Sequence, residues 1–433
     1  MSAARPGALN AGVTPREAWS WAMLDFANSG YTTVVLTAVF SAYFVGVVAD
    51  GAPWATLAWT ATLSVSYLLV MLTLPALGAR ADARARKRPL LFCAVGGCVA
   101  GMLVLTQAGP GDLWLAVVAV VISNYCYGVS DSSIASFLPE ISAPHALGRV
   151  SGWGWGLGYV GGLLSLGLAL AIVLTGEGRG EGAAVTVPRV MFATAVLFAV
   201  SVIPAALWLR ERASPSAVPV VSPLRTLALA WHEVGQRFPQ FRLLLVCGAC
   251  YQAGIAVVIT LAAVYAEQVM GFTMTQTIML IFAVNVTAAV GALSFGGFQD
   301  RIGHRKALAL TLAGWVVTAV TAFLAIDVRV FWCAACLAGL CMGTSQSAGR
   351  AMVGALAPSN RLASFYALWT FALQLAAAVG PLFYGLVTWL TGGNQRLAML
   401  LTALFFLAAL GVLSRIRFSQ GERERDSAEL QAM

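Results

Sequence analysis

Charged residues are scarce in this chain. Asp, Glu, Lys and Arg make up 10% of its 433 residues, whereas soluble domains carry roughly a quarter. So few charges cannot cover a surface that faces water, which excludes an ordinary soluble enzyme or binding domain. Apolar residues make up 59% of the chain, so the sequence predicts a protein whose solvent is the lipid bilayer. At about 20 residues per spanning helix, the chain has room for about a dozen helices.

Lysine and histidine are nearly absent. Neither Lys87 nor Lys306 follows a glycine, so neither completes the Gly-Lys-Ser/Thr loop that cradles nucleotide phosphates. This excludes an ATP-driven pump of that class. The three histidines, His145, His232 and His304, are far apart in the sequence, and metal-dependent hydrolysis needs clustered ligands. We therefore expect no cofactor, no metal site and no enzymatic activity.

Two sequence patterns resemble functional motifs but lie in apolar runs. All eight cysteines lie in apolar runs. Two pairs have the spacing of redox motifs, Cys247/Cys250 and Cys333/Cys336, but neither lies near a strand–helix unit. We interpret them as small packing residues. Residues 156–161 match a dinucleotide fingerprint but follow no strand. Gly154, Gly158 and Gly162 recur every four residues, which favours close helix packing and a sliding face between two halves.

Twelve apolar runs are separated by Gly, Pro and charged residues. They predict an all-α polytopic membrane protein with twelve transmembrane helices. The predicted spans are 21–48, 54–79, 89–108, 113–138, 150–174, 188–209, 242–266, 275–297, 307–326, 330–354, 362–390 and 396–414.

Basic residues are distributed unequally between the two sides of this arrangement. With a cytoplasmic N-terminus, 22 of the 26 fall on the cytoplasmic side and four on the other. Because Lys and Arg mark cytoplasmic loops, both termini are expected to be cytoplasmic. The basic residues occupy short loops rather than one soluble face, so no nucleic-acid partner is expected. The abundance of Arg, Ala and Gly suggests a bacterial cytoplasmic membrane.

The predicted organisation has five parts. They are an N-tail (1–18), a first six-helix bundle (19–210), a linker (211–241), a second six-helix bundle (242–415) and a C-tail (416–433). The linker begins as a flexible Ser/Pro/Val-rich segment from Glu211. Ser222-Pro223 then starts an amphipathic helix, which we expect to lie on the inner membrane face; binding to a partner is the alternative.

The two halves have the features of an internal repeat. Residues 78–88 and 296–306 both place an Asp four residues after a glycine and follow it with a basic cluster, at an offset of 218. Pro139 and Pro358 match at an offset of 219. Six spans per copy give both copies the same orientation, and parallel repeats of this kind place a binding site between the halves near the midplane.

These loops resemble the Gly-x-x-x-Asp-Arg-x-Gly-Arg-Arg signature of the major facilitator superfamily. Residues 21–29, 137–141 and 150–162 resemble its vacuole-effluxer-like branch, relatives of an autophagy-linked vacuolar amino-acid exporter. The resemblance covers about residues 17–415. It implies two pseudo-twofold-related six-helix bundles that rock about a central cavity lined by spans 1, 4, 7 and 10. Ala83 and Ala85 replace the Arg and Gly of the signature in its first copy, which predicts a looser latch there.

Polar side chains within the spans are the candidate substrate- and proton-binding residues, because an unpaired charge in hydrocarbon is costly. They are Asp25, Asn28, Tyr31, Asn124, Asp131, Tyr251, Gln252, Asn285, Gln346 and Arg350. The alternative is that they only join helices, and that Arg350 extends to the interface. The repeat places Asp131 and Arg350 at equivalent positions, so we hypothesise that they form a charge pair closing the inner half of the cavity.

The two signature loops are predicted to be gating latches. Their candidate residues are Asp82, Arg84, Arg86, Asp300, Arg301 and Arg305. Each Asp is expected to cap or pair with a helix end of its own half in one conformational state. Such a latch needs to bias two conformations by only a few kcal/mol.

The predicted function is that of a monomeric secondary transporter. By resemblance, its substrate is a small polar solute such as an amino acid, moved in the export direction, and a proton is the expected coupling ion. Its other contacts are membrane lipids. The alternatives are a membrane enzyme acting on a lipid-linked substrate and a non-transporting sensor with the same fold.

The charge distribution gives a first testable prediction. Residues 80–88, 139–149 and 298–306 should be cytoplasmic and 176–187 external. Single cysteines at Ala83 and Ala183, in a variant lacking the eight native cysteines, should react with an impermeant maleimide from opposite sides. Reaction of both from outside would contradict the topology.

Overall fold

The computed structural model describes residues 7–212, 215, 223–272 and 274–432. This part of the chain is helical, apart from one isolated bridge between Leu9 and Ser142. It contains twelve helical segments long and apolar enough to cross a membrane. The prediction of an all-α protein with twelve spans is therefore confirmed.

The first half contains six spans. The first is composite: α1 (Pro15–Tyr31), η1 (Thr32–Ala38), α2 (Phe40–Tyr43) and η2 (Phe44–Val48). The others are α3 (Ala55–Arg84), α4 (Lys87–Leu105), α5 (Leu113–Ser136), α7 (Leu147–Glu177) and α8 (Ala183–Trp208), with α6 (Leu138–Ile141) and η3 (Pro144–Ala146) between α5 and α7.

The second half follows the same plan. Its spans are α10 (Pro239–Met270), α11 (Met274–Ile302), α12 (His304–Leu324), α13 (Val328–Leu356), α14 (Leu362–Leu390) and α15 (Gln395–Leu413). Three shorter elements complete the chain: α9 (Pro223–Arg237), η4 (Ser359–Arg361) and α16 (Phe418–Ala432).

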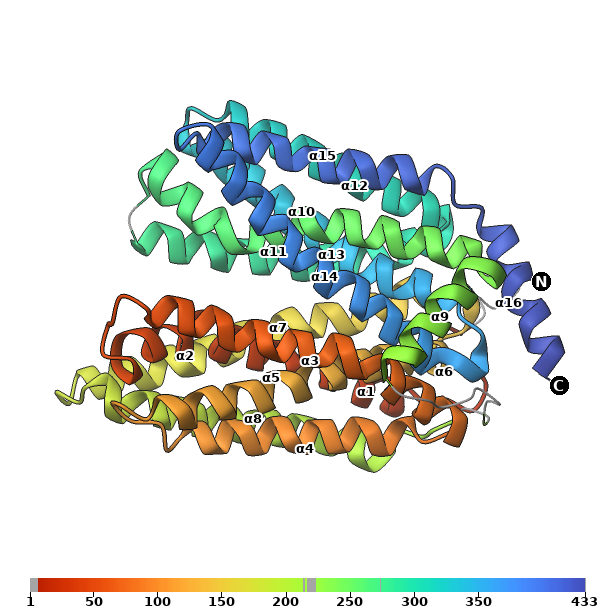
Figure 1. The fold of residues 1–433 in the computed structure, drawn as a ribbon, viewed down its shortest axis with the longest axis horizontal. Coiled ribbons are helices and arrows are strands. Elements are labelled where there is room, and N and C mark those ends of the chain that lie inside the picture. Colours follow the sequence, from red (N-terminus) through yellow and green to blue (C-terminus); the bar gives the residue numbers. More distant parts are fainter. Residues whose placement is uncertain (1–6, 213–214, 216–222, 273, 433) are drawn as a thin grey trace.

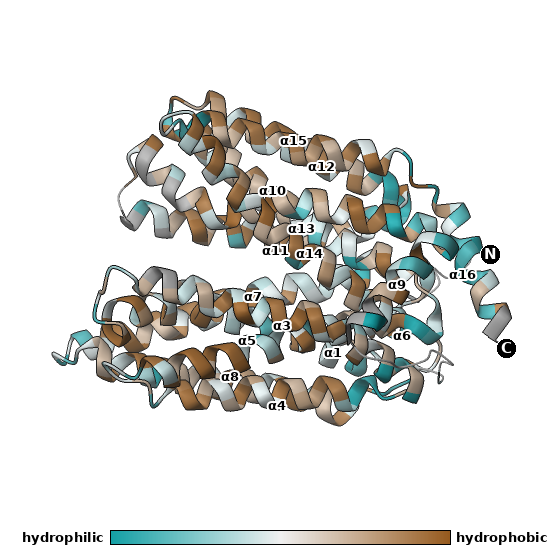
Figure 2. Cartoon of the chain, in the orientation of Figure 1, coloured by the Kyte–Doolittle hydropathy of each residue, from teal (hydrophilic) through white to brown (hydrophobic). Residues whose placement is uncertain are grey.

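The two halves lie side by side as separate helical bundles (Figure 1). The first described residues before α1, together with α9 and α16, lie at one end of the bundles, which we call the termini side (Figure 1). Hydrophobic residues run along the spanning helices, while hydrophilic ones gather at the termini side (Figure 2). Many outward-facing apolar side chains are exposed, such as Trp114 (78%) and Leu382 (73%), as expected where lipid is the solvent.

Two helices extend further than expected. The segments 78–84 and 296–302 belong to α3 and α11, so Asp82 and Asp300 lie in terminal helical turns rather than in loops. Good helix formers such as Ala and Arg continue the helix beyond the apolar run. The helix α3 ends before Ala85 (φ 49°), and α11 ends before Gly303 (φ 88°). A positive φ lies outside the right-handed helical region.

The glycines of α7 serve two neighbouring helices. A Cβ added at Gly154 or Gly158 would meet Asp25 or Ser29 of α1, and one at Gly162 would meet Thr33 of η1, all within the same half. The predicted close packing is confirmed. This face meets mainly α1 and η1 of its own half, and among its three glycines Gly154 also reaches the other half, at Arg350. A second face of α7 meets α11 of the other half and consists of Gly148, Gly152 and Gly156. This series has the same four-residue spacing as the first and is displaced from it by two residues along the helix.

The segments outside the spans are anchored at the termini side. Glu211, expected at the start of a flexible linker, accepts hydrogen bonds from the backbone N–H groups of Lys87 and Arg88 at the start of α4. Arg212 pairs with Glu17 of α1 at 2.6 Å; this hydrogen bond raises the pKa of the arginine above its ordinary value. The next residues, 213–214 and 216–222, lie outside the described part.

The amphipathic helix α9 is present, and it packs on protein. Val234 and the following Phe238 are buried in the core of the second half. Glu233 forms a bidentate pair with Arg361, at 2.6 and 2.9 Å. In the C-tail, α16 donates a hydrogen bond from Arg425 to the carbonyl oxygen of Ala355, at the end of α13. Both helices therefore pack on the termini side of the second half, and α9 also packs against α3 of the first half.

The close approach of α7 and α1 gives a stability prediction. A Cβ at Gly161 would clash with the backbone of Phe26, whereas one at Gly167 of the same helix would meet nothing within 4 Å. Gly161→Ala should lower the thermal unfolding midpoint in detergent, because overpacking costs about 1–3 kcal/mol. Gly167→Ala should leave it unchanged or raised. Equal midpoints for the two variants would contradict the packing argument.

Candidate functional site

A buried ion pair joins the two halves. Asp25 lies on α1 and Arg350 near the end of α13. Arg350 Nη1 lies 2.5 Å from Asp25 Oδ2, and Nη2 lies 2.9 Å from Oδ1. The two side chains are only 5% and 6% exposed. This bidentate arrangement is the strongest geometry available to an arginine and a carboxylate.

Aromatic side chains and one glycine position this pair. The Arg350 guanidinium lies over the rings of Trp155, at 5.0 Å, and Trp21, at 5.7 Å, which is the range of cation–π contacts. Trp21 is fixed in turn by a hydrogen bond from its indole N–H to the carbonyl oxygen of Ile134, at 2.8 Å. Gly154 faces the pair, and any Cβ there would clash with the Asp25 carboxylate.

The hypothesis of a direct Asp131–Arg350 pair is wrong in this structure. Arg350 pairs with Asp25, because α1 brings that carboxylate to the same depth as the end of α13. Asp131, on α5, is half-buried beside Asn28 and within electrostatic reach of both charges. It forms no ion pair among the described residues. The site therefore holds one arginine and two carboxylates.

Several other candidate residues are joined by hydrogen bonds within one half. Ser130 donates to Asn28 Oδ1 (3.2 Å), Asn124 donates to Ser66 (2.5 Å), and the hydroxyls of Tyr31 and Ser123 lie 2.9 Å apart. These contacts match the alternative in which polar residues hold helices together. They leave Asn28 Nδ2 and Asn124 Oδ1 buried without a partner.

The candidate residues of the second half are less closely connected. Gln346 Nε2 lies 3.5 Å from Gln252 Oε1. The Tyr251 hydroxyl is buried without a hydrogen-bond partner. Asn285 donates only to the Ile281 carbonyl of its own helix, at 2.9 Å, and the structure does not bring it to the ion pair.

Three functional candidates were missed from the sequence. Trp21 and Trp155 flank Arg350, and the indole N–H of Trp155 is buried without a partner. Gln374 of α14 has a buried, unpartnered Oε1, and it lies near Gly128, three residues before Asp131. A glutamine in an apolar run was the available signal for Gln374. No feature of the composition distinguished Trp21 and Trp155 from other residues, because aromatic residues are common in spanning helices.

Asp82 and Asp300 form two equivalent contacts between the halves. Asp82 of α3 accepts hydrogen bonds from the backbone N–H groups of Ala363 (3.0 Å) and Ser364 (2.8 Å), at the start of α14. Asp300 of α11 accepts them from Gly148 (2.8 Å) and Arg149 (2.9 Å), at the start of α7. A helix N-terminus offers free N–H groups and a partial positive charge, which stabilise a carboxylate.

These contacts correct the expectation that each Asp caps a helix of its own half. Each caps a helix of the opposite half, because α3 packs on α14 and α11 packs on α7 across the interface. The signature arginines do not take part. Arg84, Arg86 and Arg301 are exposed, and Arg305 donates to the Ser414 carbonyl within its own half, at 2.7 Å.

The hydrogen bonds between the halves cluster at the termini side. Besides the Asp82, Asp300 and Asp25 contacts, Ser151 of α7 donates to the Ser347 carbonyl of α13, at 2.8 Å. The described part of the chain contains no group of three or more His, Cys, Asp or Glu residues arranged to hold a metal ion.

The ion pair gives a conformational prediction. Asp25→Asn should destabilise the closed termini side, because removing one partner of a buried pair costs roughly 3–5 kcal/mol. A cysteine replacing the buried Ser151, in a Cys-free variant, should then react at least tenfold faster with a soluble maleimide, since about 1.4 kcal/mol corresponds to tenfold.

Two controls separate opening from unfolding. Glu181→Gln breaks an exposed pair with Arg189, which is worth under about 1 kcal/mol, and should leave the Ser151→Cys rate unchanged. A cysteine replacing Ser201, buried within one half, should stay protected in Asp25→Asn. An unchanged Ser151→Cys rate in Asp25→Asn would contradict the role of the pair.

Solved structures share this fold. The human organic anion transporter MFSD10 (TETRAN) is similar with a TM-score of 0.74 and 15% identity, over 92% of this chain and 100% of that one. The major facilitator superfamily transporter FucP in its outward conformation gives a TM-score of 0.72 and 12% identity, over 93% of this chain and 98% of that one. At these identities the likeness shows the major facilitator fold alone.

Sequence relatives specify the family. The "uncharacterized MFS-type transporter YxiO" of Bacillus subtilis is 24% identical over 396 residues, covering 90% of this chain and 92% of the relative. Autophagy-related protein 22 of Cryptococcus neoformans is 23% identical over 221 residues, covering 45% and 40%. The family model described as "vacuole effluxer Atg22 like" matches residues 55–148 and 147–426. The chain therefore belongs to the vacuole effluxer Atg22-like family and is an integral membrane transporter of the major facilitator type.

Proposed function

We propose that this transporter moves a small polar solute by alternating access, and that the termini side is cytoplasmic. The observation that carries the proposal is the Asp25–Arg350 pair, because its buried charges belong to different halves. The pair can form only when the halves meet at the termini side. Opening that side must separate it, and an alternative partner must then replace the lost contact.

A zwitterionic amino acid has the chemistry to be that partner. Its carboxylate can replace Asp25 on Arg350, with the unpartnered Trp155 indole N–H beside it. Its ammonium group can approach Asp131, which lies near both charges and pairs with neither. The family's description as effluxers supports export.

A proton is the proposed coupling ion, and Asp131 its carrier. This carboxylate lies in a spanning helix without an ion-pair partner among the described residues, where charge is costly. In one conformational state, protonation of Asp131 would remove that cost. In the other state, the approach of a cationic group would favour the ionised carboxylate again. The 22-to-4 distribution of basic residues supports cytoplasmic termini in a bacterial membrane.

Counter-flow in proteoliposomes tests the proposal. Vesicles loaded with an unlabelled amino acid mixture should accumulate labelled amino acid in the presence of the wild-type protein. Asp131→Asn should lose accumulation driven by a pH gradient, because it removes the proton carrier, and should exchange amino acid more weakly, because it also removes the carboxylate proposed to meet the ammonium group. Asp426→Asn, at an exposed position on α16, is the matched control and should behave as wild type. Binding without exchange would identify a sensor and contradict transport.

Asp82 and Asp300 should control the rate of the cycle. Replacing either by Asn removes the charge held at a helix N-terminus of the other half, and should lower turnover severalfold while changing substrate affinity little. Asp327→Asn is the matched control, because Asp327 caps α13 within its own half, accepting from the Arg329 N–H at 2.8 Å. Unchanged turnover in the Asp82→Asn/Asp300→Asn double variant would contradict gating.

A further inference from the structure

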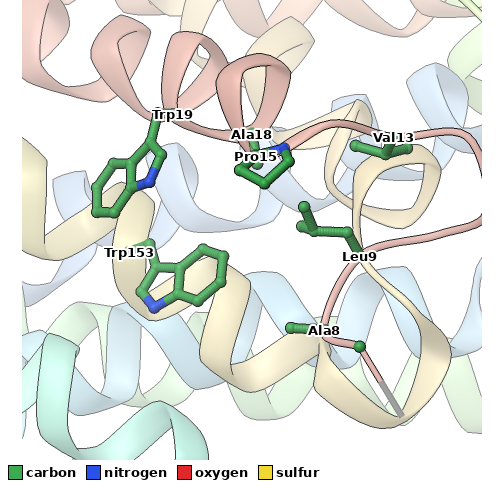
Figure 3. Close-up of a pocket in the computed structure, with 8 residues that line it drawn as sticks. Ala8, Leu9, Val13, Pro15, Ala18, Trp19 and Trp153 are labelled. Atoms are coloured by element: carbon green, nitrogen blue, oxygen red, sulfur yellow. The ribbon is translucent and has the colours of Figure 1, made fainter.

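An apolar pocket lies where α1 and α7 begin. It has a volume of about 450 Å³ and is lined by residues of the N-tail, by the first turns of α1 and by one residue of α7. The residues that line it include Ala8, Leu9, Val13, Ala18, Trp19 and Trp153. The Trp19 and Trp153 rings are stacked, with centroids 5.9 Å apart and planes at 14° (Figure 3). None of the lining residues carries a charge.

The pocket lies at the depth of a membrane surface. Trp19 lies in the second turn of α1 and is 50% exposed. Trp208, the last residue of α8, is 40% exposed. Exposed tryptophans at the ends of spanning helices are typical of the level where headgroups meet acyl chains. The pocket therefore faces the leaflet at the termini side.

Two arginines lie within about one helical turn of residues that line the pocket. Arg16 is three residues before Trp19 on α1, and Arg149 is four residues before Trp153 on α7, so each shares a helix face with one tryptophan. Both are exposed, and neither forms an ion pair within the described chain. Arg16 lies over the Trp208 ring at 5.1 Å. Of the neighbouring acids, Glu17 pairs with Arg212. Asp300 accepts hydrogen bonds from the backbone N–H groups of Gly148 and Arg149, so its carboxylate lies beside Arg149 without forming an ion pair with the guanidinium.

We propose that this pocket binds an anionic phospholipid of the leaflet at the termini side. The acyl chain would lie against the Trp19–Trp153 pair, and the headgroup phosphate would contact Arg16 and Arg149. The combination argues for a lipid, because a soluble phosphate does not need an apolar pocket and a purely apolar ligand does not need the arginines. Basic pockets between helices at a membrane surface recognise anionic headgroups in this way. The proposal is independent of the transported substrate.

Native mass spectrometry of the purified full chain tests the proposal. The protein is titrated with phosphatidylglycerol or phosphatidylcholine of the same acyl chains. Wild-type protein should bind phosphatidylglycerol at least about fivefold more tightly. The Arg16→Gln/Arg149→Gln double variant should bind both lipids equally. Arg415→Gln, at an exposed arginine beyond the end of α15, is the matched control and should keep the preference.

Two further measurements define the pocket. Ala8→Phe, which fills it, should weaken binding of both lipids, whereas soluble glycerol 3-phosphate should not displace phosphatidylglycerol. Equal binding of the two lipids by wild-type protein, or a preference that survives in the double variant, would overturn the proposal. Loss of the preference in Arg415→Gln, or unchanged lipid binding in Ala8→Phe, would also overturn it. Displacement of phosphatidylglycerol by glycerol 3-phosphate would overturn it as well, because it would indicate a site for the headgroup alone.

Discussion

The buried pair of Asp25 and Arg350 is the constraint on which the rest of the structure depends. Charges removed from water are costly unless they are paired and hydrogen-bonded, and here the two partners belong to different halves. The surroundings fit this requirement: Gly154 leaves room for the carboxylate, and Trp21 and Trp155 cover the guanidinium. The closed termini side is thus specified by a pair that neither half can satisfy alone.

The two Asp contacts add a symmetric restraint around this pair. Asp82 and Asp300 occupy equivalent positions in the repeat, and each caps a helix of the opposite half. Capping a helix N-terminus depends on a short distance, so a small separation of the halves removes it. Close backbone contact across the interface accompanies each cap: Gly78 lies against Ala363, and Gly296 against Gly148. The interface therefore has one well-defined closed arrangement.

Much of the fold could be predicted because bilayer thickness and hydropathy act locally along the chain. Twelve spans followed from apolar runs of sufficient length. Helix ends were less accurate: α3 and α11 continue to Arg84 and Ile302, because a polar, helix-favouring segment stays helical after leaving the apolar region. The C-tail, in which no helix was predicted, forms α16 by packing on the second half.

By itself the sequence determined which ionisable residues of the spans are candidates, and only the tertiary structure decided how they pair and which aromatic residues lie beside them. Asp25, Asp131 and Arg350 stand out because ionisable residues are rare within apolar runs. The repeat suggested Asp131 as the partner of Arg350, because the two residues occupy equivalent positions in α5 and α13. A repeat does not predict the depth at which a third helix, here α1, places its own side chain. That depth places Asp25 on the arginine. The same limit applies to the two glycine faces of α7. The spacing of the glycines along the sequence reveals a smooth helix face, but only tertiary packing determines which neighbouring helix that face meets.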